Sequence, residues 1–311
     1  MAEQKTKETD FLMNAEMGLG AWSWGDRMFW NYGHGYSDAD IEAAFQTSLD
    51  AGANLVDTAE VYGQGKSEHL LGQFLKNTHS QVFVATKFFP YPWRLTKGAV
   101  VRALRHSLER LGLEKLDLYQ IHQPFPPISV ETWAEGLAEA VKAGLTRTVG
   151  VSNYNKNQMQ RAYTVLAKYE VPLASNQVEY HLLDRSIEKN GLLDRCKELG
   201  VRLIAYSPLA MGILTGKYTP ENPPPGLRGR RFGGLIKSVQ PLIALMKEIG
   251  RDCGEKTPGQ VALNWTICKG ALPIPGAKTA TQASQNTGAL GWRLTPEQVK
   301  ALDEASDMIN A

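Results

Sequence analysis

Short apolar runs alternate with amphipathic stretches along most of the chain. Residues 97–111 carry apolar side chains three or four positions apart, which predicts one buried face of a helix: Val100, Leu104, Leu108 and Leu111. Comparable patterns predict helices over 38–51, 66–76, 129–143, 155–169, 188–199, 238–252, 258–268 and 295–308. The β-branched runs between them predict strands over 18–22, 54–58, 82–87, 116–122, 148–153, 174–180, 201–207 and 271–276.

The predicted strands lack a clean alternation of apolar and polar positions. Continuous apolar runs of this kind are typical of parallel strands that are buried on both faces. Eight such strands that alternate with helices predict an α/β fold of the (β/α)8 TIM barrel type, with its site at the C-terminal ends of the strands. An open doubly wound sheet is the alternative, but GLGAWSWG at 18–25 does not continue as the G-x-G-x-x-G turn which that fold favours.

The repeating pattern indicates a single domain over residues 1–311, in which we expect residues 1–10 to be a frayed N-terminus. Two segments interrupt it. One is an aromatic loop over 23–36, and the other is an insertion rich in proline, glycine and arginine over 208–237. Long loops without secondary structure are uncommon unless they are functional or disordered.

Composition excludes several classes of protein. A chain that is 43% hydrophobic and 21% charged has the composition of a soluble globular protein. Its net charge of +2 gives no reason to expect nucleic acid or a membrane surface as partner. The three cysteines are widely separated, which predicts no disulfide framework and fits a reducing, cytoplasmic location. No apolar run is long enough to span a membrane, and the histidines show no metal-binding spacing.

Polar or ionisable residues end successive apolar strands. In a barrel these ends face one side, so the side chains should converge on one pocket. Each residue alone also has a structural interpretation: Asp57 as a cap, Lys87 as a solvated strand end, His122 and Tyr62 as packing residues. Their joint occurrence at equivalent positions favours a site. The residues concerned are Asp57, Lys87, His122, Ser152, Asn153, Gln177, Tyr206 and Ser207.

Two apparent motifs fail on spacing. GQGKS at 63–67 lacks the first glycine of a phosphate-binding loop, because position 60 is Glu60. GVSNY at 150–154 is not a nucleophile elbow, because its last position is Tyr154.

Over essentially its whole length the chain resembles an aldo-keto reductase. The segments that carry the resemblance are GANLVDTAEVYG (52–63), Lys87 of VATK, His122 of LYQIH, GVSNY (150–154), NQVEYH (176–181), AYSPLAMGILTGKY (205–218) and LPIPGAKT (272–279). So many segments in order, at the spacing of a barrel, make this resemblance highly specific.

The resemblance implies a catalytic tetrad of Tyr62, Asp57, Lys87 and His122. Enzymes of this family reduce an aldehyde or ketone with hydride from a nicotinamide, and Tyr62 would be the general acid. A free tyrosine has a pKa of about 10, and Lys87 beside the hydroxyl should bring that pKa down. Asp57 would keep Lys87 charged, and His122 would orient the carbonyl oxygen.

The resemblance also implies a cofactor site. Ser152, Asn153 and Gln177 would bind the nicotinamide amide, and Tyr206 would stack on its ring. Trp22 is expected to contact the cofactor and also to line the pocket for the substrate. A loop that would close over the pyrophosphate carries Ser207, Leu209, Gly212, Leu214, Gly216 and Lys217. Gly276 to Thr279 would open a helix whose N-terminus suits a phosphate, followed by residues near the adenine: Gln282, Gln285 and Asn286.

Lys278 is the candidate for binding an adenosine 2′-phosphate. Family members often place arginine near position 282 and glutamate at 285, whereas both are glutamine here, so less charge is available to recognise that group. NADPH is nevertheless favoured over NADH. Three arginines of the insertion could also contact the phosphate or could be solvated: Arg228, Arg230 and Arg231.

Aromatic side chains near the strand ends predict a pocket for a carbonyl compound with an aromatic or apolar body. They are Trp22, Trp24, Phe29, Trp30, Phe88, Phe89 and Phe125. Pyridoxal, other aromatic aldehydes, methylglyoxal-like carbonyls and sugar aldehydes all remain open. We expect a monomeric carbonyl reductase. The alternatives are a nicotinamide-binding regulatory subunit with slow turnover and, less compatible with Tyr62, a barrel isomerase or aldolase in which Lys87 forms a Schiff base.

Overall fold

A computed structural model describes residues 10–224, 226, 229 and 233–309. Its strands are β1 (Gly18–Gly20), β2 (Leu55–Asp57), β3 (Phe83–Phe88), β4 (Leu116–Ile121), β5 (Thr146–Ser152), β6 (Leu173–Glu179), β7 (Arg202–Tyr206) and β8 (Leu272–Pro273). Its α-helices are α2 (Asp38–Asp50), α3 (Lys66–Asn77), α4 (Gly98–Leu111), α5 (Val130–Lys142), α6 (Lys156–Lys168), α7 (Ser186–Lys189), α8 (Leu192–Leu199), α10 (Gln240–Asp252), α11 (Pro258–Cys268), α12 (Ala280–Thr287) and α13 (Pro296–Asp307). Short 3-10 helices are η1 (Tyr62–Gly65), η2 (Ala210–Thr215) and η3 (Gly233–Leu235).

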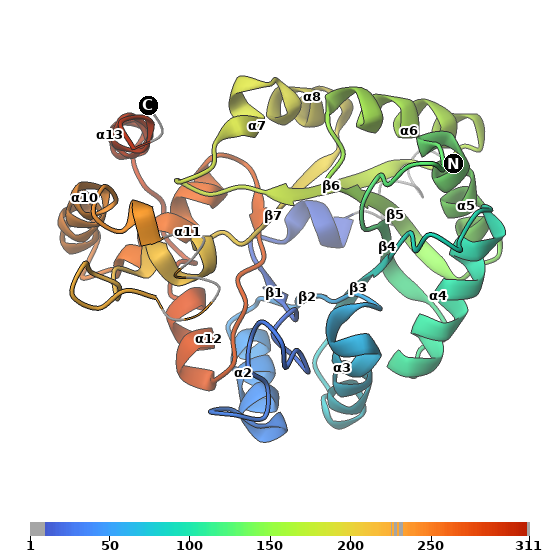
Figure 1. Cartoon of the computed structure of the whole chain (residues 1–311), viewed down its shortest axis with the longest axis horizontal. Helices are drawn as coiled ribbons and strands as arrows, with labels where there is room; N and C mark the ends of the chain where they lie inside the picture. Colours follow the sequence, from blue (N-terminus) through green and yellow to red (C-terminus); the bar gives the residue numbers. More distant parts are fainter. Residues whose placement is uncertain (1–9, 225, 227–228, 230–232, 310–311) are drawn as a thin grey trace.

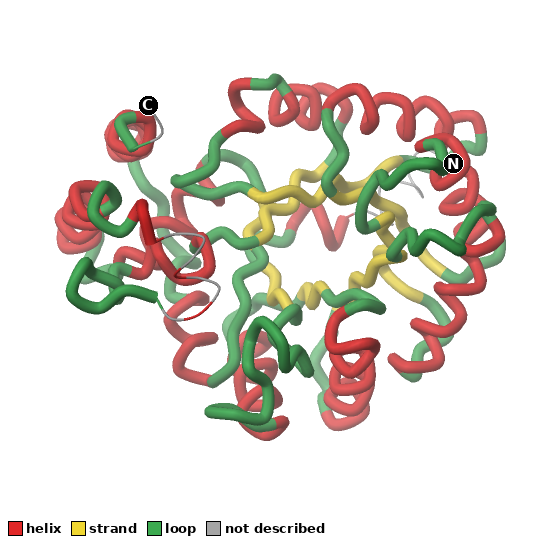
Figure 2. The backbone as a smooth tube through the Cα atoms, viewed as in Figure 1, coloured by secondary structure: helices red, strands yellow, loops and turns green. Residues whose placement is uncertain are grey.

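In the described residues, eight parallel strands follow one another in sequence order around a ring, and helices surround that ring (Figures 1 and 2). The ring closes where Gly20 pairs with Gly276 and donates its N–H to the Pro275 carbonyl at 3.1 Å. A side chain at Gly20 would place Cβ only 2.8 Å from the Ile274 carbonyl oxygen, so this closure requires glycine. The predicted (β/α)8 barrel is confirmed.

The interior of the barrel is divided into an apolar layer and a polar layer. Residues two apart on a strand share a face, and Leu55 and Ala85 point into the barrel, where they pack with Leu12. Asp57 and Lys87, two positions later on the same strands, therefore also point inward, nearer the carboxyl ends. Strand register alone thus places two ionisable groups above an apolar floor.

A short helix over residues 10–14 covers that floor from the other end of the barrel. Its Leu12 is fully buried among the inward-facing residues of the strands, and Phe11 stacks on Phe83 at 4.7 Å between ring centroids. Residues 1–9 of the stretch predicted to be frayed lie outside the described residues, whereas Asp10 belongs to this helix.

The outer helices bury the faces that their apolar spacing predicts. In α4 the buried residues include Val100, Leu104, Leu108 and Leu111. The helix predicted over 188–199 is instead two helices, because Asn190 ends α7 and Gly191 adopts a φ of +74° before α8 begins. The insertion after β7 contains η2 and η3, and its Arg228, Arg230 and Arg231 lie outside the described residues.

Candidate active site

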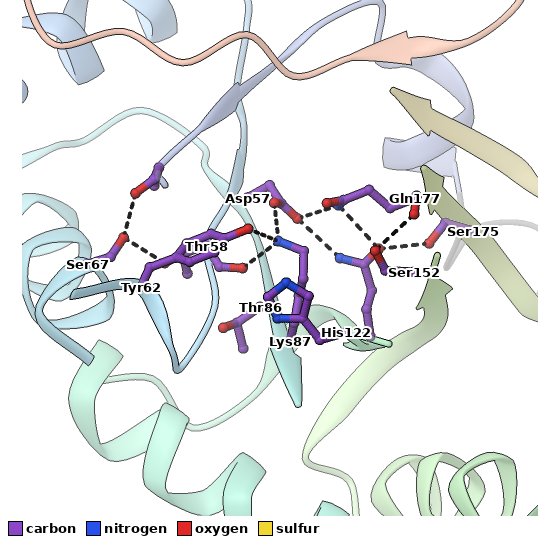
Figure 3. Close-up of polar contacts among 12 residues, drawn as sticks. Asp57, Thr58, Tyr62, Ser67, Thr86, Lys87, His122, Ser152, Ser175 and Gln177 are labelled. Atoms are coloured by element: carbon purple, nitrogen blue, oxygen red, sulfur yellow. Dashed lines mark hydrogen bonds and ion pairs between the residues drawn. The ribbon is translucent and has the colours of Figure 1, made fainter. Parts of the chain in front are cut away.

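The four predicted catalytic residues come together at the carboxyl ends of β2, β3 and β4. Lys87 is fully buried and forms an ion pair with Asp57. The same ammonium donates to the Thr58 carbonyl oxygen at 2.9 Å and to the Tyr62 hydroxyl at 3.3 Å (Figure 3). The ring of His122 meets that of Tyr62 edge to face, with 5.8 Å between centroids. The geometry therefore connects a buried cation to a tyrosine hydroxyl beside a histidine.

Asp57 is held by two amides as well as by Lys87. Gln120 and Gln177 donate from Nε2 to Asp57 Oδ1 at 3.1 Å and 2.8 Å. Gln120 is fully buried, and its Oε1 accepts a bond from Ser175 at 3.4 Å. Reasoning from the sequence missed Gln120, although an amide inside the apolar run LDLYQIH was a usable signal. Gln177 contacts the tetrad directly, in addition to its predicted place beside the nicotinamide.

Burial and charge act in opposite directions on the pKa values of the tetrad. Burial raises the pKa of Tyr62 above its ordinary value and outweighs the opposing effect of the Lys87 ammonium. The expected lowering of the Tyr62 pKa is thus reversed, and the hydroxyl keeps its proton at neutral pH. Burial lowers the pKa of Lys87, but Asp57 and Tyr62 overcome it, so its pKa is raised.

His122 is uncharged at neutral pH. Burial, assisted by the nearby Lys87 charge, lowers its pKa to about 3. Its backbone is fixed by a bond from its N–H to the Phe88 carbonyl at 2.9 Å, and the carbonyl of His122 accepts from Asn153 at 3.0 Å. Within the described structure, the buried Nδ1 of this ring has no hydrogen-bond partner. A neutral imidazole in this position can donate a hydrogen bond to a substrate oxygen without changing the charge of the site.

The tetrad opens into a cavity of about 860 Å³. Most of the residues predicted to bind a cofactor line it: Trp22, Ser152, Asn153, Gln177, Tyr206, Ser207, Leu209, Gly212, Lys217, Gly276, Lys278, Gln282, Gln285 and Asn286. Two predicted residues do not. Leu214 is fully buried in the core, and Gly216 packs beside Ile243. Lys87 also lies outside the lining, because it is buried beneath Asp57 and Tyr62.

Side chains at the ends of β5 and β7 are fixed to one another beside the tetrad. The Tyr206 hydroxyl donates to Asn153 Oδ1 at 2.9 Å, and Ser152 donates to the Gln177 carbonyl at 2.9 Å. Asn153 adopts a φ of +60°, a conformation that asparagine tolerates better than most residues. The strand ends thus present amide and hydroxyl groups in a fixed arrangement close to Tyr62.

The far end of the cavity is formed by the first turns of two helices. Thr257, Gly259 and Gln260 at the start of α11 line it, although no motif in the sequence pointed to them. At α12, Thr279 caps the helix and accepts from the Gln282 N–H at 3.3 Å. The N-terminus of a helix carries unpaired N–H groups and partial positive charge, and therefore suits an anion.

Lys278 connects this end of the cavity to the aromatic loop after β1. Its ammonium donates to the Trp30 carbonyl at 3.1 Å and lies 4.8 Å and 4.5 Å from the ring centroids of Trp30 and Tyr36. The backbone N–H of Lys278 donates to Gln282 Oε1 at 2.9 Å. Asn286 donates to the Gly276 carbonyl at 3.2 Å.

Aromatic residues line the end of the cavity near the tetrad, but fewer than predicted. Trp22, Trp30 and Phe89 line it, and Phe29 stacks on Trp22 with 5.0 Å between centroids. Phe125 lies outside the lining, 42% exposed and 5.9 Å from Phe89.

Two of the predicted pocket aromatics belong instead to the core. Trp24 is fully buried against Phe45 and Phe74. Phe88 is fully buried against Trp133 of α5, because alternation along β3 turns it outward when Lys87 points inward.

Other kinds of site find no support in the described part of the chain. Among residues 10–224, 226, 229 and 233–309, no cluster of histidine, cysteine, aspartate and glutamate side chains could hold a metal ion. Over the same ranges, no helix has the length and apolar character needed to cross a bilayer.

Comparison with known proteins places the chain in a family. Residues 16–307 match the profile described as Aldo/keto reductase family. The chain is 41% identical over 303 residues to "Pyridoxal reductase, chloroplastic" of Arabidopsis thaliana, across 93% of this chain and 82% of the relative. A glycerol dehydrogenase structure from Gluconobacter oxydans aligns with a TM-score of 0.81 at 29% identity, covering 93% of this chain and 90% of that one. An aldo-keto reductase from Klebsiella pneumoniae in complex with NADPH aligns with a TM-score of 0.74 at 31% identity, with coverage of 93% and 90%. The predicted class of enzyme, an oxidoreductase, is confirmed, and the chain belongs to the aldo/keto reductase family.

Proposed function

We propose that this protein reduces an aldehyde on an aromatic body to the alcohol, using NADPH, with Tyr62 as the general acid. The observation that carries the proposal is the contact of the buried Lys87 ammonium with the Tyr62 hydroxyl, 3.3 Å away, at the base of a long cavity. A protonated tyrosine and a neutral histidine face the place where a carbonyl oxygen would sit, and the paired lysine lies beneath the tyrosine hydroxyl.

The residues along the cavity fit a nicotinamide dinucleotide. Amides of Asn153 and Gln177 lie near Tyr62, where a nicotinamide carboxamide would bind, and helix N-termini with Lys217 and Lys278 suit the phosphates. NADPH is the cofactor we assign, supported by the related Klebsiella pneumoniae structure in complex with NADPH. Bound there, it would supply the hydride for the carbonyl carbon.

The tetrad supplies the proton and stabilises the negative charge that its loss leaves on Tyr62. As negative charge develops on the carbonyl oxygen, Tyr62 donates its phenolic proton to that oxygen, and the alcohol forms. The Lys87 ammonium stabilises the phenolate left behind, and Asp57 holds that ammonium in place. His122, being neutral, donates a hydrogen bond that orients the carbonyl. Protons and charge balance, because one hydride and one proton together reduce one carbonyl group.

An uncharged aromatic substrate is supported by the walls of the cavity. Trp22 and Phe89 lie next to the tetrad, 6.4 Å from the Tyr62 ring and 5.5 Å from the His122 ring between centroids. The cations of the described lining are Lys217 and Lys278, and Lys278 lies against Trp30 rather than against these two rings. The Arabidopsis thaliana relative is named a pyridoxal reductase, which is an enzyme for a heteroaromatic aldehyde. We therefore rank neutral aromatic aldehydes, with pyridoxal as one member, above sugar and phosphorylated aldehydes.

The protein is further proposed to be a cytoplasmic monomer. Its cysteines Cys196, Cys253 and Cys268 are free thiols, as a reducing compartment allows. Gel filtration with light scattering measures the mass, and a dimer would contradict the proposal.

The test is a titration of the protein with NADPH and with NADH, followed by fluorescence. Aldehydes such as 4-nitrobenzaldehyde and pyridoxal are then added while nicotinamide absorbance is measured. Tight NADPH binding and oxidation on adding aldehyde are expected. Tight binding without oxidation for any aldehyde would favour the regulatory subunit, and the absence of binding would refute the assignment of the cofactor.

A further inference from the structure

The loop after β3 carries a row of aromatic rings that begins at the tetrad. Phe89 meets the ring of His122 edge to face, with 5.5 Å between centroids, and its ring is tilted by 55° against that of Tyr91 at 4.8 Å. Tyr91 and Trp93 stack nearly parallel, 4.7 Å apart with 6° between their planes. Phe89, Tyr91 and Trp93 are named here the aromatic shelf. The shelf runs from a wall of the cavity outward to Trp93, which is 72% exposed.

A largely buried ion pair fixes the aromatic shelf. Glu60 accepts from both terminal nitrogens of Arg94, with one of these contacts at 2.9 Å. Glu60 also accepts from the Phe89 N–H at 2.7 Å, while Arg94 donates to the Phe89 carbonyl at 2.8 Å. The guanidinium lies 5.1 Å from the centroid of the Tyr91 ring. The rings are therefore held in place by neighbours that do not belong to the cavity.

The chemistry of the aromatic shelf favours a flat, uncharged ligand. Single exposed apolar residues are ordinary on protein surfaces, but contiguous exposed apolar groups mark binding sites. Here Phe89 is shared with the catalytic cavity, and Phe125 flanks it from the loop after β4. The charge of Arg94 is matched by Glu60, so the shelf presents aromatic surface rather than a charge, and Trp93 is its most exposed ring. Ring faces bind other rings by offset stacking.

We propose that the aromatic shelf is an outer substrate subsite that binds the second ring of an extended aromatic aldehyde while the carbonyl group lies at Tyr62 and His122. This inference rests on the proposed reduction. It adds to single-ring aldehydes a preferred class of neutral bicyclic or biaryl aldehydes, whose far ring reaches beyond Phe89 toward Tyr91 and Trp93.

The experiment compares the unmodified protein with Trp93→Ala, using benzaldehyde as the short substrate and biphenyl-4-carbaldehyde as the long one. Loss of one stacking partner should lower kcat/KM for the long aldehyde roughly three- to tenfold, mainly through KM. The kcat/KM for benzaldehyde and the affinity for NADPH should not change. Tyr169→Ala is the matched control, because Tyr169 is 48% exposed and follows α6 at the opposite end of the barrel.

Equal losses for both aldehydes would overturn the subsite, since Trp93 would then act by holding its loop. No loss for the long aldehyde would overturn it as well. If the unmodified protein reduces neither aldehyde, the proposed reduction is refuted, but the subsite can still be tested by measuring ligand binding. Calorimetry then compares biphenyl-4-methanol on the two proteins in the presence of NADP+. A three- to tenfold weaker affinity for Trp93→Ala supports the subsite, and equal affinities refute it.

Discussion

Replacing Lys87 by methionine tests whether the tetrad is a charged unit. Lys87 is fully buried and bonds to Asp57, to the Thr58 carbonyl at 2.9 Å and to the Tyr62 hydroxyl at 3.3 Å. Methionine nearly preserves the volume, but it leaves the Asp57 carboxylate without its cation in a site where that side chain is 3% exposed. Removing one partner of a buried ion pair costs about 3–5 kcal/mol, so the variant should lose that much free energy of unfolding.

The double variant Asp57→Asn with Lys87→Met separates stability from catalysis. Replacing both charges of a buried pair by neutral groups is often neutral or stabilising. An asparagine at 57 can still accept the amide bonds from Gln120 and Gln177. The double variant should therefore recover most of the stability, with a coupling free energy of roughly 2–4 kcal/mol between the two positions. It should not recover reduction, because no ammonium remains to stabilise the Tyr62 phenolate.

Urea unfolding followed by circular dichroism, without added cofactor, measures these differences. Lys168→Met is the control, because Lys168 is an exposed residue in the last turn of α6, and its change should stay within about 0.5 kcal/mol. A loss of less than about 1 kcal/mol for Lys87→Met would refute the reasoning, since a buried carboxylate cannot lose its cation so easily. A double variant as unstable as Lys87→Met alone would refute it as well.

Three further predictions concern individual residues of the cavity. Tyr62→Phe should lower kcat by about 10²- to 10⁴-fold while NADPH affinity, measured by fluorescence, stays nearly constant; more than a few per cent of residual turnover would exclude Tyr62 as the acid. Lys278→Ala should weaken NADPH roughly tenfold or more through loss of a charge-assisted bond and weaken NADH less, whereas equal losses would mean that Lys278 does not bind the 2′-phosphate. His122 has its pKa lowered to about 3 in the folded protein. The unfolded chain therefore binds a proton that the folded protein does not as pH falls from about 6.5 toward 3, which costs about 1.4 kcal/mol of stability per pH unit. His122→Gln should reduce the acid slope of urea unfolding by that amount, and an unchanged slope would contradict the burial of a neutral imidazole.

The barrel and its polar layer could be predicted because both depend on patterns local to each strand. Runs such as VFVATK and LDLYQIH carry the apolar character of a buried strand, and each ends in a polar group. Parallel strands bring such ends to one side of the barrel, so convergence follows from the fold class alone. The placement of Asp57 and Lys87 over an apolar floor needs only the two-residue period of a strand.

The pocket aromatics were harder to predict, because burial depends on neighbours distant in sequence. Phe88 and Phe89 are adjacent, and alternation after Lys87 would have identified Phe88 as outward-facing. Trp22 and Trp24 lie in an irregular loop, where no period applies. Trp24 is held in the core partly by a bond from its indole N–H to the Ala277 carbonyl at 3.2 Å, a contact that local sequence does not indicate.

The remaining parts of the site follow from the closure of the barrel. The first turn of α11 reaches the cavity because the chain after β7 folds back on it, where Gly259 lies against Leu209 and Thr215. Gln120 becomes a partner of Asp57 only because β3 and β4 pair with Lys87 opposite it. Both depend on how segments pair in space rather than on the composition of either segment.

The position of Tyr62 has a different origin from that of its buried partner. Lys87 owes its place to strand register, whereas Tyr62 lies in η1, within a loop between two anchors. On one side Glu60 is bound by Arg94, and on the other the Ser67 hydroxyl donates at 3.0 Å to a backbone carbonyl just after β1. Glu60, Arg94 and Ser67 lie outside the lining of the cavity, whereas Ala21, whose carbonyl accepts the Ser67 bond, belongs to it. Both contacts are made within the protein, so substrate binding is not required to form either of them. The proposed acid is therefore held in position largely by residues outside the cavity, which is the preorganisation that electrostatic catalysis requires when charge develops on a carbonyl oxygen.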